Sequence, residues 1–174
     1  MKDTVMDRDA FALLAELFTY PSEETEAKAR RCVALLTHSD EKVAKLVDRF
    51  REFVEREGLE KLENIYTYTF DLTPSCPPYI GHYIFGEDYR RSYFMVGLKE
   101  TYRRYGYSYD ERELPDHIAV LLAFLPFYES EEERGELISL CLIPALKEMV
   151  KNLKDGNPYK VLLEATFLIL GGGE

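Results

Sequence analysis

Asp116 and His117 are the neighbouring residues in this chain whose side-chain types best suit a general acid–base pair. They follow Pro115 at the start of an apolar run, so we expect both in the first turn of a helix. Free amides in such a turn stabilise a carboxylate and disfavour a protonated imidazole. Both side chains are then expected at the mouth of the core rather than inside it. The alternative is an ordinary first-turn anion beside a satisfied surface histidine.

A second candidate is the proline–tyrosine segment, residues 74–83, PSCPPYIGHY. Its three prolines make a stiff loop, and Tyr79, His82 and Tyr83 follow directly. Ten of the 13 tyrosines lie between Tyr66 and Tyr109. Tyrosine combines a large contact area with few rotatable bonds and a polar tip, which suits peptide recognition. The alternative is that these rings pack helices together.

A third feature is charge. Residues 110–136 hold nine carboxylates against two arginines, and Glu113 and Asp116 are among the nine. Such a stretch attracts an arginine-rich peptide through charge-assisted hydrogen bonds. The alternative is a solvated helix face.

Familiar cofactor and nucleotide signatures are missing from the sequence. It contains no GxxxxGK[ST] loop, no GxGxxG, no HExxH and no CxxC. Pro115 separates Glu113 from His117, so these two do not form the Glu-x-x-His pair of a di-iron bundle. Cys76 and His82 are too few ligands for a metal site. We therefore expect no bound metal, molybdopterin or haem.

The elements that must position these residues are helices, because the apolar spacing is helical nearly throughout. Ser39 or Asp40 is expected to cap the third helix and Gly58 to end it. Pro115 and Pro158 are each expected at the first position of a helix.

The uncharged run of residues 118–128 predicts a helix buried in the middle of a bundle. Glu131–Glu133 suits the first turn of the next helix, which Pro144 should kink. We predict an all-α fold, one domain spanning residues 1–174 as a bundle of about nine helices. Its ends should fray at about residues 1–7 and 171–174.

Composition narrows the function classes. The net charge of −10 argues against nucleic acid and against an anionic membrane surface as partners. No apolar run approaches the roughly 20 residues that span a bilayer, so no direct membrane insertion is expected. The amino-terminal residues show no basic region followed by an apolar run, so no secretory signal is expected. These features predict a cytoplasmic protein.

Four motifs in order resemble the NarJ/TorD/DmsD family of redox-enzyme maturation chaperones, and most closely its nitrate reductase delta-subunit (NarJ-like) branch. They are the stretch FALLAELFTYP of residues 11–21, Tyr66-x-x-x-Phe70-Asp71, Pro77-Pro78-Tyr79 with Tyr83, and Glu113-Leu114-Pro115-Asp116-His117. The similarity covers roughly residues 9 to 170. One departure is the absence of tryptophan, which related chaperones often carry near the proline–tyrosine region.

The resemblance implies a non-enzymatic, all-α chaperone whose partner is the catalytic subunit of a molybdopterin oxidoreductase. Such proteins bind the N-terminal region of that subunit, often a twin-arginine signal or its remnant, and assist cofactor insertion before export or membrane docking. GTP binding is implied by resemblance alone. The expected peptide-binding residues are Tyr66, Phe70, Pro78, Tyr79, His82, Tyr83, Glu113, Asp116 and His117.

Three readings of the chain therefore compete. An open groove near His117 would favour the chaperone. A small closed pocket would favour a helical enzyme that uses Asp116 and His117 as an acid–base pair. A solidly packed surface there would favour an acidic structural subunit. The sequence leaves the choice between a monomer and a domain-swapped dimer open.

Overall fold

Side-chain caps define where several helices begin. The computed structural model describes residues 7–72 and 75–173. Asp40 accepts a hydrogen bond from the amide of Val43 at 3.1 Å, so one of the two predicted caps is confirmed. Asp7, Ser130 and Asn157 cap three other helices in the same way. Each cap satisfies an amide that a helix start would otherwise leave unpaired.

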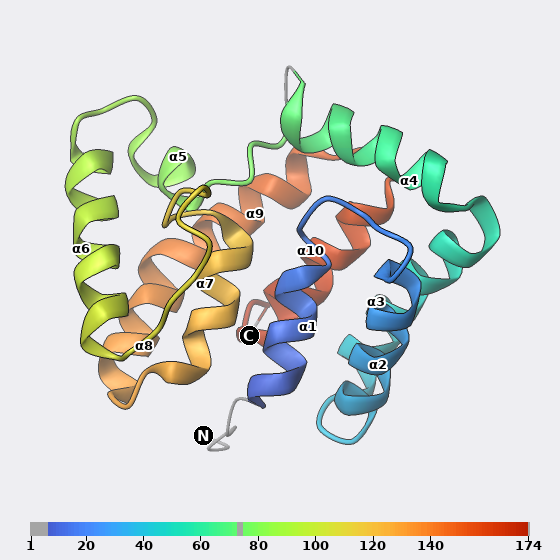
Figure 1. Ribbon diagram of the computed structural model, residues 1–174, viewed down its shortest axis with the longest axis horizontal. Coiled ribbons are helices and arrows are strands. Elements are labelled where there is room, and N and C mark those ends of the chain that lie inside the picture. Colours follow the sequence, from blue (N-terminus) through green and yellow to red (C-terminus); the bar gives the residue numbers. More distant parts are fainter. Residues whose placement is uncertain (1–6, 73–74, 174) are drawn as a thin grey trace.

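The chain forms an all-α bundle (Figure 1). The α-helices are α1 (Arg8–Glu16), α2 (Thr25–Thr37), α3 (Glu41–Glu57), α4 (Leu59–Tyr66), α5 (Ile80–Phe85), α6 (Arg90–Arg104), α7 (Ile118–Phe124), α8 (Glu131–Leu137), α9 (Ile143–Asn152) and α10 (Pro158–Ile169). Two π-helical stretches, η1 (Thr67–Asp71) and η3 (Ile138–Leu142), and the 3-10 turn η2 (Leu125–Phe127) continue neighbouring α-helices. Because α8, η3 and α9 run on without a break, the prediction of about nine helices is confirmed.

One hydrophobic core holds the bundle together. Helix α3 packs against α2 and α10, and α1 packs against α2 and α7. Every residue of α7 except Ala123 is buried, which confirms that the uncharged run lies inside the bundle. In Figure 1, α6 stands apart at the left edge, on the opposite side of the molecule from α2 and α3.

The start of α7 differs from the prediction. Pro115 was expected at its first helical position, but α7 begins at Ile118 and His117 is its N-cap. The reason is that residues 114–117 form a turn, in which the His117 amide donates to the Leu114 carbonyl at 3.1 Å, and that His117 itself is extended and paired with Tyr79. Helix α5 was not predicted at all, since its six residues are too few to show a helical period.

Pro144 shapes the long helix that it was expected to kink. The π-helical stretch η3 precedes it, and the amide of Ile143 donates to the carbonyl of Ile138, five residues back. A proline has no amide to continue an α-helical ladder. The irregularity therefore takes the form of a widened π-helical turn.

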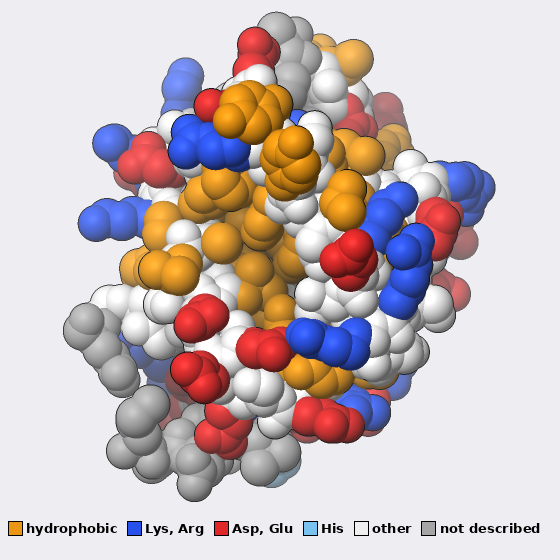
Figure 2. Space-filling view, turned by 90° about the vertical axis from the view of Figure 1, so that its left-hand side faces the viewer, with side chains coloured by type: hydrophobic (Ala, Val, Ile, Leu, Met, Phe, Trp, Pro, Cys, Tyr) orange, Lys and Arg blue, Asp and Glu red, His pale blue; other side chains and the backbone are white. Residues whose placement is uncertain are grey.

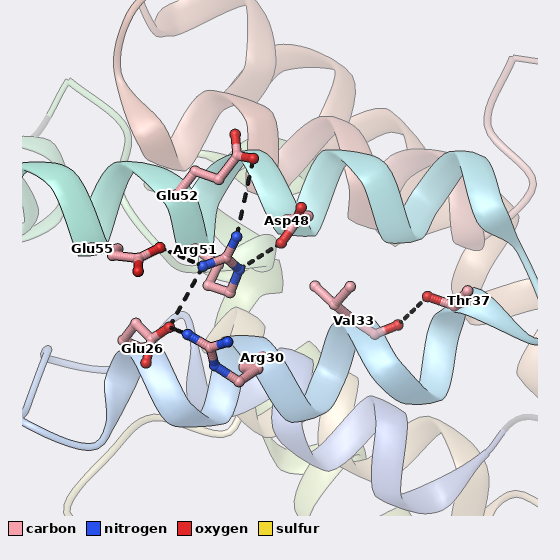
Figure 3. A network of polar contacts seen from close by, with 8 residues as sticks. All are labelled: Glu26, Arg30, Val33, Thr37, Asp48, Arg51, Glu52 and Glu55. Atoms are coloured by element: carbon pink, nitrogen blue, oxygen red, sulfur yellow. Dashed lines mark hydrogen bonds and ion pairs between the residues drawn. The ribbon is translucent and has the colours of Figure 1, made fainter.

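A polar network on the far side of the bundle ties α2 to α3 (Figure 3). The Arg51 guanidinium lies within 4.0 Å of four carboxylates, those of Glu26, Asp48, Glu52 and Glu55. Glu26 comes from α2 and also pairs with Arg30 on that helix. Its contact with Arg51, 3.6 Å long, crosses between the two helices.

The ends of the chain were expected to fray. The predicted frayed ends lie partly outside the described residues, at 1–6 and 174, while Gly172 donates its amide to the carbonyl of Phe167 at 2.8 Å. None of the helices described is both long and apolar enough to cross a bilayer. Residues 7–72 and 75–173 contain no β-strand, only one isolated bridge.

Candidate peptide-binding site

The isolated β-bridge joins the proline–tyrosine segment to the segment that contains Asp116 and His117. Tyr79 and His117 form an antiparallel pair. The amide of Ile80 donates to the Asp116 carbonyl at 2.8 Å, and the amide of Ile118 donates to the Pro78 carbonyl at 2.8 Å. The two segments therefore contact each other directly, with no space between them for a peptide backbone.

Asp116 lies at the centre of a three-part clasp with Arg91 and Gly81. Its carboxylate is fully buried, accepts from Arg91 Nε at 2.9 Å and Nη2 at 3.2 Å, and also accepts from the Gly81 amide at 3.1 Å. The expectation that Asp116 lies at the mouth of the core is wrong. The clasp explains why: a bidentate guanidinium and an amide from α5 satisfy the charge inside the fold.

His117 is also buried, against the expectation of a side chain at the mouth. Its Nδ1 accepts from the Ala119 amide at 3.0 Å, and its ring meets the Tyr79 ring edge-on, with the centroids 5.5 Å apart. Burial lowers the pKa of His117, while the nearby carboxylates of Glu113 and Asp116 oppose that shift. Thus the neutral imidazole is favoured, and it serves as a helix cap.

Glu113, which is partly exposed, contacts both Tyr79 and His117. The Tyr79 hydroxyl donates to Glu113 Oε1 at 3.0 Å, and Glu113 Oε2 lies 3.8 Å from His117 Nε2. Burial, followed by this hydrogen bond to a carboxylate, raises the pKa of Tyr79 to about 12. The Arg91 guanidinium lies over the Tyr79 ring, 5.4 Å from its centroid. The structure therefore brings Pro78, Tyr79, Glu113, Asp116 and His117 together.

These contacts do not suit an acid–base pair. Arg91 and the Gly81 amide occupy the Asp116 carboxylate, and the Ala119 amide occupies His117 Nδ1. A general base needs an accessible lone pair within reach of substrate. The arrangement supports a structural role for the two side chains.

The other predicted residues lie in different surroundings. Tyr66 and Phe70 are buried in a ring cluster with Tyr159, and the Tyr66 hydroxyl donates to the Phe18 carbonyl at 3.1 Å. These two rings pack helices together, as the alternative reading of the tyrosines supposed. A role for them in peptide binding stays a prediction.

His82 and Tyr83 lie at the end of the proline–tyrosine segment. His82 is exposed, and its ring meets the Tyr83 ring edge-on at 5.1 Å. The Tyr83 hydroxyl donates to the Pro77 carbonyl at 2.7 Å, which closes the segment on itself. Neither side chain belongs to the clasp.

An open hollow that the sequence did not reveal lies between α6 and the α8–η3 helix. We call it the α6–α8 groove, and its volume is about 360 Å³. It is lined by Phe94, Gly97, Leu98, Thr101, Tyr128, Glu133, Glu136, Leu137, Leu140 and Cys141. Figure 2 looks at the side of the molecule on which α6 lies. It shows the groove as an apolar hollow in the centre, with acidic side chains gathered at its lower edge. Neither Asp116 nor His117 lines it.

Two contacts fasten the wall formed by α6 to the segment before α7. Arg91, in its first turn, is held by Asp116, and the Tyr102 hydroxyl, near its end, donates to the Pro115 carbonyl at 2.7 Å. The opposite wall carries Leu140, whose side chain is 67% exposed. Leu140 therefore adds exposed apolar surface at the edge of the groove.

A second hollow, of about 400 Å³, lies beside η1 and the start of α10. Its lining includes Asn152, Lys154 and Asn157. In the part of the chain that the structure describes, no group of three or more histidine, cysteine or acidic residues could hold a metal ion. Neither hollow thus offers a metal centre.

Comparison with known proteins decides the family. Residues 36–153 match the model of the nitrate reductase delta subunit. The chain belongs to this family. A relative from Bacillus subtilis (strain 168), described as a nitrate reductase molybdenum cofactor assembly chaperone, NarJ, is 30% identical over 126 residues, which is 72% of this chain and 68% of the relative.

The fold agrees with that of a solved structure. A redox enzyme maturation protein from Archaeoglobus fulgidus superposes with a TM-score of 0.66 over 98% of this chain and 99% of the other. At 23% identity this likeness shows the fold alone. The region matched to the nitrate reductase delta subunit family contains the clasp and both walls of the groove. The resemblance drawn from the four motifs is confirmed.

Proposed function

We propose that this chain is a cytoplasmic chaperone that holds an N-terminal segment of the catalytic subunit of a molybdopterin oxidoreductase while its cofactor is inserted. Membership of the nitrate reductase delta subunit family supports the kind of partner. The relative from Bacillus subtilis and the protein from Archaeoglobus fulgidus are described as a chaperone and a maturation protein, not as catalysts. This chain is accordingly not an enzyme.

The observation that carries the proposal is the open α6–α8 groove. It offers apolar side chains from both walls, with Leu140 exposed on its lip. A short segment of a client can bury two or three apolar side chains there, each worth about 1.5–3 kcal/mol when fully buried. The groove, rather than the space beside His117, is the binding surface we propose. The clasp then serves to position α6.

Purification and peptide titration together test the function. The tagged chain, isolated from its native cytoplasm, should carry a molybdopterin oxidoreductase catalytic subunit, identified by mass spectrometry. A synthetic peptide with the N-terminal sequence of that subunit should then bind in calorimetric titration. Absence of binding to the wild-type chain would reject the proposal.

A matched pair of variants tests the surface. Leu140→Ser should weaken peptide binding about five- to tenfold, because an apolar contact is lost. Leu72→Ser is the control, since Leu72 is 60% exposed and lines neither hollow. Equal affinity of both variants would exclude the groove while leaving the function standing.

A further inference from the structure

The groove has two unlike ends. The end of α6 meets the start of α8, because Arg104 pairs with Glu133 and the Tyr105 hydroxyl lies 3.4 Å from the same carboxylate. Phe94, nearer the start of α6, lines the groove with Leu140 of η3. The two helices therefore run in opposite directions along the groove. One end is acidic and the other is apolar.

The two carboxylates at the acidic end differ in their partners. Arg104 neutralises Glu133 within the chain itself. Glu136 lies one helical turn further along α8 and is exposed. Within residues 7–72 and 75–173 it has no lysine, arginine or histidine within 4.0 Å. Glu136 is thus the groove carboxylate whose charge is left for a partner.

We infer that Glu136 receives a lysine or arginine of the bound segment, while Arg104 occupies Glu133 and keeps that carboxylate from it. The inference rests on the proposed function and adds the chemistry and the direction of the segment. Its basic end lies beside Glu136 and Thr101, and its apolar side chains follow the groove toward Phe94 and Leu140. The charge left uncompensated in the groove is negative, which selects a basic partner.

Removing the charge of Glu136, and separately that of a carboxylate outside the groove, tests the role of Glu136. Glu136→Gln should weaken binding of a basic, apolar peptide about two- to fivefold, the range for an exposed ion pair. Glu132→Gln, on the same helix but not in the groove lining, should leave affinity unchanged. The difference in affinity between these two variants should shrink as the salt concentration rises from about 0.05 to about 0.5 M. Over that range the electrostatic screening length falls from about 14 to about 4 Å.

Removal of the internal cation tests the other half of the inference. Arg104→Gln frees Glu133 and removes a positive charge from the acidic end, so binding should tighten about two- to fivefold. Arg103→Gln is the matched control, because it removes the neighbouring charge, which has no ion-pair partner among the described residues. Arg104 is exposed, so the variant is expected to fold.

Cys141 reports whether the groove is the place occupied. Its thiol is half-buried in the groove lining, whereas Cys32 and Cys76 are buried in the core. The probe is the N-terminal peptide of the co-purified catalytic subunit, and alkylation of Cys141 by iodoacetamide is followed by mass spectrometry. Bound peptide should slow this alkylation in the wild type and in every variant that binds.

The outcomes distinguish the two proposals. Protection of Cys141 together with weaker binding by Glu136→Gln and tighter binding by Arg104→Gln supports the inference. Protection with unchanged affinity in both variants overturns it and leaves the chaperone function intact. Failure of the peptide to bind the wild-type chain rejects the proposed function itself.

Discussion

The Arg91 guanidinium binds both carboxylate oxygens of Asp116, although 25 residues separate the two in the chain. The Asp116 side chain is fully buried and that of Arg91 is 23% exposed. Removing one partner of a buried ion pair leaves the other uncompensated, which is costlier than losing both. The pair thus fastens the start of α6 to the segment before α7.

Asp116→Asn should therefore destabilise the fold by about 2–4 kcal/mol, because Arg91 keeps its charge without a counter-ion. The measurement is the free energy of unfolding in urea. Arg90→Gln serves as the control, since Arg90 is exposed and pairs only with its near neighbour Asp88. A loss of unfolding free energy below about 0.5 kcal/mol, which is typical of a solvent-exposed ion pair, would contradict the structural role of the clasp.

Gly81→Ala should be destabilising by about 1–3 kcal/mol through overpacking. An added Cβ would lie 2.6 Å from Asp116 Oδ2 and 3.1 Å from Arg91 Cγ, so the clasp would have to open. Gly135→Ala in α8 is the matched control: nothing lies within 4 Å of its Cβ, and alanine favours a helix by up to about 1 kcal/mol. Opposite signs for the two changes in melting temperature are expected, and a neutral Gly81→Ala would refute the close contact.

Stability should fall on mild acidification because of His117. Burial puts its folded-state pKa below the unfolded value of 6.5, so the unfolded chain binds the proton first as the pH falls. The stabilising contribution is therefore present above pH 6.5 and is lost as the pH drops below it. Protonation would also remove the lone pair that caps α7.

His117→Asn keeps a capping acceptor and removes the titration. Between about pH 7.5 and 5.5, the variant should lose less unfolding free energy than the wild type. His82→Asn is the control, because His82 is exposed and lies outside the clasp. Equal slopes for the wild type and His117→Asn would show that His117 does not titrate in this window.

The Arg51 network should add modest stability. Arg51→Met removes the one cation that meets four carboxylates, and we expect a loss of about 0.5–1 kcal/mol that shrinks at high salt. Arg56→Met is the control, since that side chain is 66% exposed and pairs only with its neighbour Glu57. Thermal melts at two salt concentrations measure both, and a salt-independent loss would indicate packing instead.

Local signals in the sequence predicted much of the helical framework. Asp40 as a cap, Glu131–Glu133 in a first turn, Pro158 at a first position and the buried run after His117 all follow from short-range chemistry. Such features depend on neighbours within one or two turns. They can be read without knowing the tertiary structure.

The surroundings of the candidate site could not be read in that way. The partner of Asp116 is 25 residues away, and the groove needs α6 beside α8, which no local pattern specifies. Pro115 was placed at the start of a helix because a first-turn proline is favourable, but it lies in a turn that ends at His117, which pairs with Tyr79. Tertiary contacts overrode the local preference.

Both fastenings of α6 lead to the same dipeptide. Arg91 is tied to the side chain of Asp116, and Tyr102 to the carbonyl of Pro115. Both residues are buried and neither lines the groove. One wall of the groove is therefore anchored to the interior of the bundle at residues that a bound segment would not contact.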